Sequence, residues 1–316
     1  MTQPTAPIDV TVTARTTTGD VVVIDLARAD GAALPAWTPG SHVDVLMPEG
    51  MIRQYSLCGA PDADTWRIAV LREEGGRGGS RWLSAHAVEG ATLQVVGPRN
   101  HFAFEPAGGP VLLLAAGIGV TPLSAMAAEA ARSGVDYRLH YSGSRRAAMA
   151  LADELVAAHG DRCELHVSDE GTRLDLEAAF AQVTADTVAY ACGPSRFLQA
   201  VEAAAAARDV PLRVEHFTPV ELDEPVLQGG FEVELAMTGI TVEVPPDQSI
   251  LAAVEEQGVL VLSSCTEGTC GTCETPVLAG EVDHRDSILT PAERERGDVM
   301  YVCVSRAACP RLTLDL

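Results

Sequence analysis

The stretch Cys265-Thr-Glu-Gly-Thr-Cys270-Gly-Thr-Cys273, followed by Cys303, decides how the last third of the chain is interpreted. Its C-x4-C-x2-C spacing with a distant fourth cysteine is the plant-type arrangement for a 2Fe-2S cluster. Three thiolates supplied within nine residues require a tightly wound loop, which the two glycines of this stretch permit. A structural zinc site is the alternative, but it usually has two C-x2-C pairs, and only one is present. We therefore predict that Cys265, Cys270, Cys273 and Cys303 are the ligands of a 2Fe-2S cluster.

The residues before this loop predict a small α+β domain over residues 226–316, for which the resemblance given below implies the ferredoxin (β-grasp) fold. The segments FEVELAMTG and ITVEVPP alternate like the two strands of a hairpin, and DQSILAAVEEQG predicts a helix that begins at Asp247 or Ser249. The stretch from Pro219 to Gly230 has acids, proline and paired glycine without periodicity, which is typical of a linker.

Upstream, strands and helices alternate, which predicts a doubly wound α/β domain over residues 107–225. Its first strand ends in Leu113-Leu-Ala-Ala-Gly117-Ile-Gly119-Val-Thr121-Pro122, and a later strand ends in Cys192-Gly193-Pro194. Glycine turns at the carboxyl ends of parallel strands are where such sheets bind dinucleotides. The first motif is incomplete, because proline stands where the third glycine of G-x-G-x-x-G would fall, so a plain tight turn is the alternative.

The first part of the chain, residues 1–106, reads as short strands separated by glycine and proline, which predicts an antiparallel β-barrel. On one strand lies Arg53-Gln54-Tyr55-Ser56, where Arg53 and Tyr55 share a face and could hold a phosphate and an aromatic ring. The loop Gly75-Gly-Arg77-Gly78-Gly79-Ser80 precedes a helix expected over Arg81 to Ala87, with Ser80 as its cap. Glycine-freed amides at a helix start can bind an anion, although a solvent-exposed loop is the alternative.

The net charge of −22 argues against binding to nucleic acid or to an anionic membrane surface. Residues 226–316 contain 15 acidic residues and only 5 arginines, which favours an acidic docking surface for a basic partner protein. No long apolar run and no signal-like N-terminus is present. The cysteine spacings are not those of a disulfide framework, so we expect a cytoplasmic protein in a reducing compartment.

Together these motifs resemble the phthalate dioxygenase reductase family, whose flavin barrel, nicotinamide domain and plant-type ferredoxin follow in this order. The resemblance implies that Arg53 and Gln54 bind flavin, that Tyr55 packs on its ring and that Ser56 bonds near its N5. It also assigns Leu71, Gly78, Gly79 and Ser80 to the flavin site. The G-R-G-G-S loop is similar to members that bind FMN, so FMN is expected rather than FAD.

For the nucleotide, the resemblance matches Gly117, Gly119, Thr121 and Pro122 to the family's G-x-G-x-T-P segment, and Cys192, Gly193 and Pro194 to its C-G-P segment. It implies catalytic roles for Ser56, Thr121, Cys192 and Phe217. Phe217 resembles the aromatic residue that covers the nicotinamide face of the flavin, with core packing as the alternative. The family's usual donor is NADH, while the arginines of Tyr141-Ser-Gly-Ser144-Arg145-Arg146 leave NADPH open.

The expected function follows from electron counting. Nicotinamide releases two electrons as hydride and the cluster accepts one, so a flavin is needed between them. The resemblance implies a terminal oxygenase as partner, either a Rieske non-haem iron dioxygenase or demethylase acting on aromatic compounds, or a haem monooxygenase. A redox sensor and a bare electron carrier are the alternatives from other classes. We expect a monomer that binds neither nucleic acid nor membrane.

Overall fold

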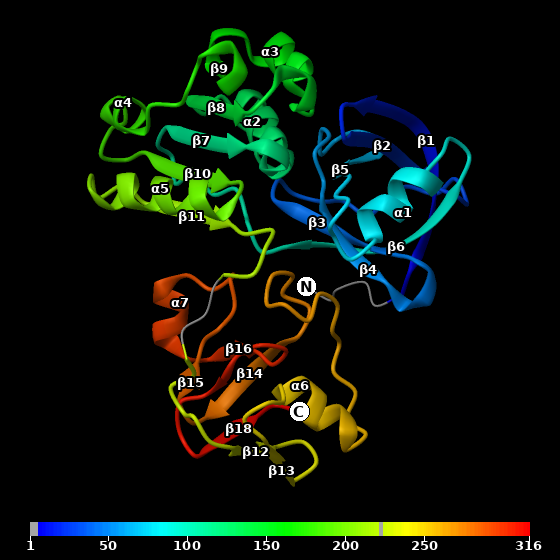
Figure 1. Cartoon of the computed structure of the whole chain (residues 1–316), viewed down its shortest axis with the longest axis vertical. Helices are drawn as coiled ribbons and strands as arrows, with labels where there is room; N and C mark the ends of the chain where they lie inside the picture. Colours follow the sequence, from blue (N-terminus) through cyan, green and yellow to red (C-terminus); the bar gives the residue numbers. More distant parts are fainter. Residues whose placement is uncertain (1–5, 221–223) are drawn as a thin grey trace. The chain divides into compact units, whose positions relative to one another are not determined.

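A computed structural model describes residues 6–220 and 224–316 (Figure 1). The chain forms two compact units, Met1–Phe217 and Thr218–Leu316. The boundaries expected from the sequence, 106/107 and 225/226, stay predictions. Part of the expected linker, residues 221–223, lies outside the described residues. Among the helices of the described residues, none combines the length and apolar character needed to cross a bilayer.

The first unit begins with a curled antiparallel sheet of six strands in the order β4-β3-β6-β1-β2-β5. A bridge between Leu57 and Ile68 joins the end of β4 to β5, which brings the two edges of the sheet together. Alternate residues of β6 are buried, as expected of a strand with one face on a core. The strands are β1 (Ile8–Thr18), β2 (Val21–Arg28), β3 (Ser41–Leu46), β4 (Ile52–Ser56), β5 (Trp66–Leu71) and β6 (Thr92–Asn100). The expected barrel fold is thereby confirmed.

Helix α1 (Gly79–His86) lies between β5 and β6 and corrects one expectation. It begins two residues earlier than expected, after Gly78 in the left-handed conformation (φ 87°), and no side chain caps it. Ser80 is therefore inside the first turn instead of capping it. Its Oγ accepts a hydrogen bond from the Glu73 amide at 3.2 Å, which holds the preceding loop against the helix.

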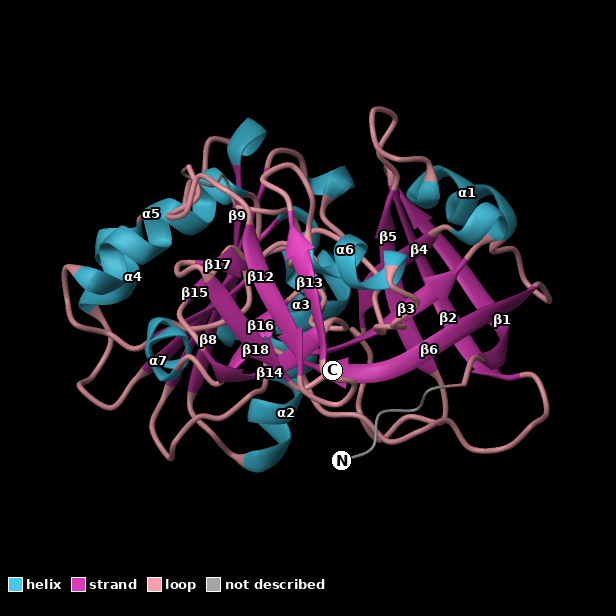
Figure 2. Cartoon of the chain, turned by 90° about the horizontal axis from the view of Figure 1, so that it is seen from below, coloured by secondary structure: helices cyan, strands magenta, loops and turns pink. Residues whose placement is uncertain are grey.

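The second part of this unit is a parallel five-stranded sheet in the order β11-β10-β7-β8-β9 (Figure 2). The chain adds β8 and β9 on one side of β7 and then β10 and β11 on the other, so the strand order reverses between β7 and β10. Its strands are β7 (Val111–Ala116), β8 (Tyr137–Gly143), β9 (Cys163–Val167), β10 (Val188–Cys192) and β11 (Leu212–Glu215). A reversal of this kind leaves a crevice at the carboxyl ends of the two central strands.

Helices cover both faces of the parallel sheet. Helices α2 (Val120–Ser133) and α3 (Ala152–His159) share a core with one face, and α4 (Leu176–Ala181) and α5 (Ser195–Ala206) share a core with the other. All six residues of β7 are buried, because this strand is central and covered on both sides. The doubly wound class expected from the sequence is confirmed.

The second unit has a mixed sheet in the order β13-β12-β18-β14-β16 and a separate pair, β15 with β17. The strands are β12 (Phe231–Leu235), β13 (Ile240–Val244), β14 (Glu274–Ala279), β15 (Val282–Asp283), β16 (Val299–Tyr301), β17 (Arg306–Ala307) and β18 (Arg311–Leu314). The predicted hairpin is present as β12 and β13. Helix α6 (Ile250–Glu256) starts at Ser249, whose side chain accepts from the Ala252 amide, and α7 (Pro291–Arg296) starts with a capping box at Thr290.

Candidate functional sites

The four cysteines of the predicted cluster site lie in one buried loop region of the second unit. Their exposures are 5, 2, 3 and 7% for Cys265, Cys270, Cys273 and Cys303. Cys273 directly precedes β14 and Cys303 follows β16 by two residues, and these strands pair with Glu274 opposite Tyr301. Strand pairing therefore brings together two cysteines that are 30 positions apart in sequence.

Backbone amides of the loop point at the sulfurs. The Glu267 amide donates to Cys265 Sγ at 3.3 Å and the Thr269 amide at 3.5 Å, while the Cys265 amide lies 3.4 Å from Cys270 Sγ. Thiol hydrogen bonds from Cys270 and Cys303 lower the pKa of Cys265 and favour its thiolate. Such donors stabilise negative charge on sulfur, so this set of four sulfurs fits a cluster with only thiolate ligands.

Two features require glycine at position 268: its backbone angle, and the close approach of neighbouring atoms to its Cα. Its φ is +69°, and a Cβ there would lie 2.6 Å from Val304 Cγ2 and 3.1 Å from the Asp286 Cα. Any side chain would push the loop away from the segment that carries Cys303.

In the first unit, Arg53 of β4 lies across the start of α1. A Cβ on Gly79 would lie 2.6 Å from Arg53 Cγ, so the two residues are in direct contact. Arg53 donates to the Arg77 carbonyl at 3.1 Å and to the Ile52 carbonyl at 2.7 Å. A guanidinium beside an uncapped helix N-terminus forms a positive site that suits a phosphate.

The rest of β4 is held by a buried polar network. Gln54 donates to Asp44 at 2.8 Å, and Asp44 pairs with Arg99 at 2.6 Å with both side chains about 95% buried. Burial raises the pKa of Tyr55 to about 12, so its ring is a neutral phenol near neutral pH.

Two further residues assigned to the flavin site lie on the same sheet. Ser56 is buried at the end of β4, and Leu71 ends β5 half-buried. The structure thus brings Arg53, Gly78 and Gly79 together, and the role of each residue toward a flavin stays a prediction.

The two glycine turns pack directly on each other at the reversal of strand order. A Cβ on Gly119 would lie 2.3 Å from the Cys192 carbonyl oxygen and 2.6 Å from the Gly193 amide nitrogen. A Cβ on Gly193 would lie 2.9 Å from Ala116 Cβ. Gly117 has φ +56°, which turns the chain from β7 into the helix. The motifs recognised separately in the sequence are therefore one joint feature of β7 and β10.

Helix α2 is anchored to this feature and to the barrel. Thr121 donates to the Ile118 carbonyl at 2.9 Å, and Ser124 donates to the Cys58 carbonyl at 3.2 Å. Pro122 is buried in the first turn of α2, and Pro194 precedes the first residue of α5. A proline in the first turn of a helix has no amide that needs a partner there, so Pro122 is compatible with the start of α2.

Glu215 is a candidate that the sequence interpretation missed. It ends β11 opposite Cys192 in the parallel ladder. Its Oε2 is buried and has no hydrogen-bond partner among the described residues, and burial raises the pKa of its carboxyl to about 8. Burial also raises the pKa of the Cys192 thiol, which stays protonated. A buried polar atom without a protein partner calls for an explanation, which a bound water or a ligand would supply. The sequence signal was weak, because the strand Leu-Arg-Val-Glu alternates apolar and charged residues like any half-exposed strand.

Phe217 follows Glu215 by two residues and is 41% exposed. This exposure is higher than that of a core residue, and the two interpretations of Phe217, a cover over a flavin and core packing, both stay predictions.

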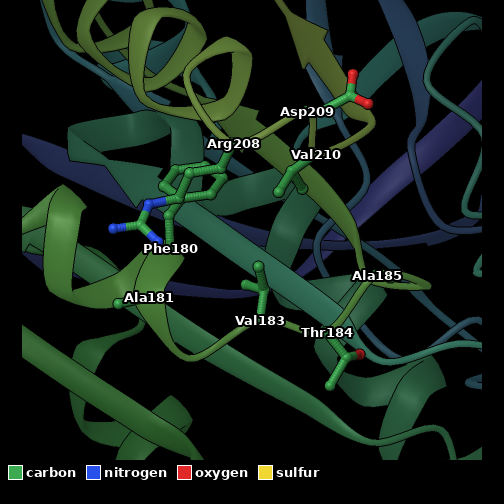
Figure 3. A pocket seen from close by; sticks show the side chains of 8 residues that line it. All are labelled: Phe180, Ala181, Val183, Thr184, Ala185, Arg208, Asp209 and Val210. Atoms are coloured by element: carbon green, nitrogen blue, oxygen red, sulfur yellow. The ribbon is translucent and has the colours of Figure 1, made fainter.

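A separate pocket lies beside the loops that lead into β10 and β11, at the amino ends of these strands and away from the glycine turns (Figure 3). It is lined by the end of α4 and the loop before β10, and by the loop after α5: Phe180, Ala181, Val183, Thr184, Ala185, Arg208, Asp209 and Val210. These loops precede their strands, whereas the glycine turns follow theirs, so this pocket is not part of the turn site.

Taken together, a curled barrel, a doubly wound sheet with paired glycine turns and a four-cysteine β-grasp domain define a multi-domain electron-transfer reductase. Residues 233–308 match the family model described as a 2Fe-2S iron-sulfur cluster binding domain. The chain is 43% identical over 301 residues to phenoxybenzoate dioxygenase subunit beta of Ectopseudomonas oleovorans, covering 94% of this chain and 93% of that protein. The crystal structure of phthalate dioxygenase reductase aligns with a TM-score of 0.70 at 31% identity over 98% of both chains. The chain belongs to the phthalate dioxygenase reductase family.

It is accordingly an oxidoreductase of the kind that serves oxygenases. A type IV self-sufficient cytochrome P450 monooxygenase also matches, with a TM-score of 0.92 and 43% identity. The match covers 98% of this chain but only 41% of that longer protein. The same architecture therefore occurs within a larger haem monooxygenase chain.

Proposed function

We propose that this chain oxidises NADH and delivers electrons one at a time to a terminal oxygenase, with FMN and a 2Fe-2S cluster as its bound groups. The observation that carries the proposal is the contact of Gly119 with Cys192 and Gly193, within the same compact unit as Arg53 and Gly79. One unit thus combines glycine turns at a reversal of strand order, where such sheets bind dinucleotides, with a positive site that suits a phosphate.

The residues of the first unit bind and orient. Arg53 and the N-terminus of α1 offer positive charge to a flavin phosphate, and the neutral Tyr55 offers an aromatic face. The glycine turns admit the pyrophosphate of the nucleotide, because their lack of side chains lets a ligand reach the backbone amides. The Glu215 carboxyl, largely protonated near neutral pH, is available to a nicotinamide amide. Bound flavin supplies the conversion from two-electron to one-electron transfer.

The preference for NADH is supported by the loop after β8. Arg146, a candidate for binding a 2′-phosphate, is ion-paired with Asp153 at 2.5 Å. Because both side chains are exposed, this pair competes only weakly with a 2′-phosphate for Arg146, so the preference for NADH over NADPH is a weak one.

The proposed partner is a Rieske-type dioxygenase or demethylase that acts on an aromatic compound. Support comes from the dioxygenase relative, which aligns over nearly its whole length as a separate subunit. A haem monooxygenase is the second candidate, favoured by the structural match to the self-sufficient P450. A monomeric state and a cytoplasmic location belong to the same proposal.

An anaerobic visible titration tests the proposal. The purified holoprotein is titrated with NADH and then with NADPH, and the released flavin is identified after denaturation. We expect FMN, a flavin band together with a longer-wavelength iron-sulfur shoulder, and faster bleaching by NADH. A bare electron carrier would not be bleached by either nucleotide, and a redox sensor would be reduced slowly without turnover; either result would contradict the proposal.

A further inference from the structure

Three side chains outside the electron-transfer sites converge on the outer strands of the parallel sheet. His140 lies on β8, and Glu164 and His166 lie on its neighbour β9, where register places His140 opposite Glu164. Residues two apart on a strand share a face, so Glu164 and His166 point to the same side. One donor atom of each lies within 4.8 Å of the others.

The distances in this cluster allow the three side chains to bind one ion together, although the two histidines are also within hydrogen-bond distance of each other. His140 Nδ1 is 3.1 Å from His166 Nε2, and the Glu164 oxygens lie 3.5 Å from His140 Nδ1 and 3.8 Å from His166 Nε2. The two carboxylate distances exceed those of ordinary hydrogen bonds. Tetrahedral ligands with metal bonds of about 2.0–2.1 Å lie about 3.3 Å from one another, which is close to all three values.

The imidazoles are also in the state that metal binding requires. His140 and His166 are 8 and 7% exposed, and burial lowers the pKa of both, so they are neutral near neutral pH. The His166 ring also donates to the Arg173 backbone, which fixes the ring and leaves Nε2 facing His140. Outer-shell hydrogen bonds of this kind orient metal-binding histidines. The charged neighbour that opposes a cation is Arg138 on β8.

We propose that His140, Glu164 and His166 form a binding site for one divalent transition-metal ion, with a fourth position left to water. Two imidazoles and one carboxylate select zinc-like ions over calcium or magnesium. The ion joins the edge strand β9 to β8, so it acts as a clip on the outer side of the nucleotide-binding sheet. The site is independent of the electron-transfer function proposed above.

Zinc binding to the tag-free holoprotein tests this proposal. Protein with intact cluster, verified by iron content and absorbance, is dialysed against buffered Zn2+, and bound zinc is measured by mass spectrometry. We expect about one zinc per chain, and zinc K-edge X-ray absorption with nitrogen and oxygen neighbours including imidazole. Zinc–sulfur neighbours would mean that the metal entered the cysteine loop and would overturn the assignment.

Variants separate a real site from adventitious zinc. His166→Gln removes one proposed ligand, and Glu164→Gln removes another whose side chain is 62% exposed. His86→Gln alters an exposed histidine elsewhere. Loss of an outer-shell group alone weakens zinc binding about 10- to 100-fold, so both ligand variants should lose at least that much and His86→Gln nothing.

Zinc should also raise the unfolding temperature of the wild-type protein but not of Glu164→Gln. Wild-type protein without stoichiometric zinc, or equal binding by all variants, would show that the two histidines form only a hydrogen-bonded pair.

Discussion

The Glu215 carboxyl ends β11 with its Oε2 buried and without a partner among the described residues. Its pKa of about 8 lies well above the ordinary 4.5, so the folded chain holds a proton that the unfolded chain releases between these values. Stability linked to this group is complete below pH 4.5 and is lost as the pH rises through 8.

Glu215→Gln removes this proton linkage. Compared with the variant, the wild-type protein should lose about 1–3 kcal/mol of unfolding free energy between mildly acidic and mildly alkaline pH. Urea unfolding followed by tryptophan fluorescence measures it, because Trp37, Trp66 and Trp82 all lie in the first unit. Parallel pH curves for the two proteins would mean that the carboxyl is solvated.

Among single residues, the sequence predicted those site residues whose role depends on their spacing along the chain. The cysteine loop is readable because three of its ligands lie within nine residues. Glu215 was not readable, because its position beside Cys192 depends on parallel pairing between strands separated by helix α5. Burial of a single carboxylate oxygen cannot be deduced from a strand pattern.

Among the elements, β7 and β10 are coupled through the contact of Gly119 with the Cys192 backbone. Gly119→Ala places a methyl group 2.3 Å from a carbonyl oxygen, and because both partners are backbone, one turn must move. We expect a loss of about 1–3 kcal/mol in stability of the first unit, together with weaker NADH binding.

Tryptophan-detected urea unfolding and an NADH titration measure the two effects of Gly119→Ala. Gly75→Ala is the matched control, because Gly75 also lies in the first unit and no atom lies within 4 Å of its added methyl group. Wild-type stability in Gly119→Ala would show that the turns adjust without cost.

The strands of the barrel and of the parallel sheet were predictable, because apolar alternation and buried runs are local signals. The residue at which α1 begins was not predictable. Arg53 packs against Gly79 from a different strand, and this contact together with the left-handed Gly78 fixes where the helix begins. Nothing in the sequence near Ser80 indicates that its hydroxyl is used by the Glu73 amide instead of a helix cap.

On the scale of the whole molecule, the order of electron transfer can be tested by comparing the reduction of two different electron acceptors. Cys270→Ser should prevent formation of the cluster and abolish reduction of a one-electron protein acceptor such as cytochrome c. Ferricyanide reduction should persist, because it draws electrons from the first unit.

Iron content and both reductase activities are measured for Cys270→Ser and for the control Cys309→Ser. Cys309 lies outside the loop and bonds only backbone groups, so its replacement should be neutral. Equal loss of both activities in Cys270→Ser would contradict the proposed order.

The order of the three fold types along the chain was predictable, because each type has its own hydrophobic periodicity and its own sequence motif. The identity of the partner was not predictable, because the motifs of this chain bind cofactors and none of them identifies an electron acceptor. If the acid-rich part of the chain after Val226 is a docking face, as expected above, its charge favours a basic partner surface without identifying the partner protein.

The second unit has a hydrophobic core of its own, made of residues between Leu227 and Leu316. For protein engineering, this makes the Phe217–Thr218 boundary a natural crossover point. Chimeras that exchange the segment after this junction between homologous reductases keep each core intact, so electrons could be redirected to a new acceptor by exchanging whole units, without redesigning either core.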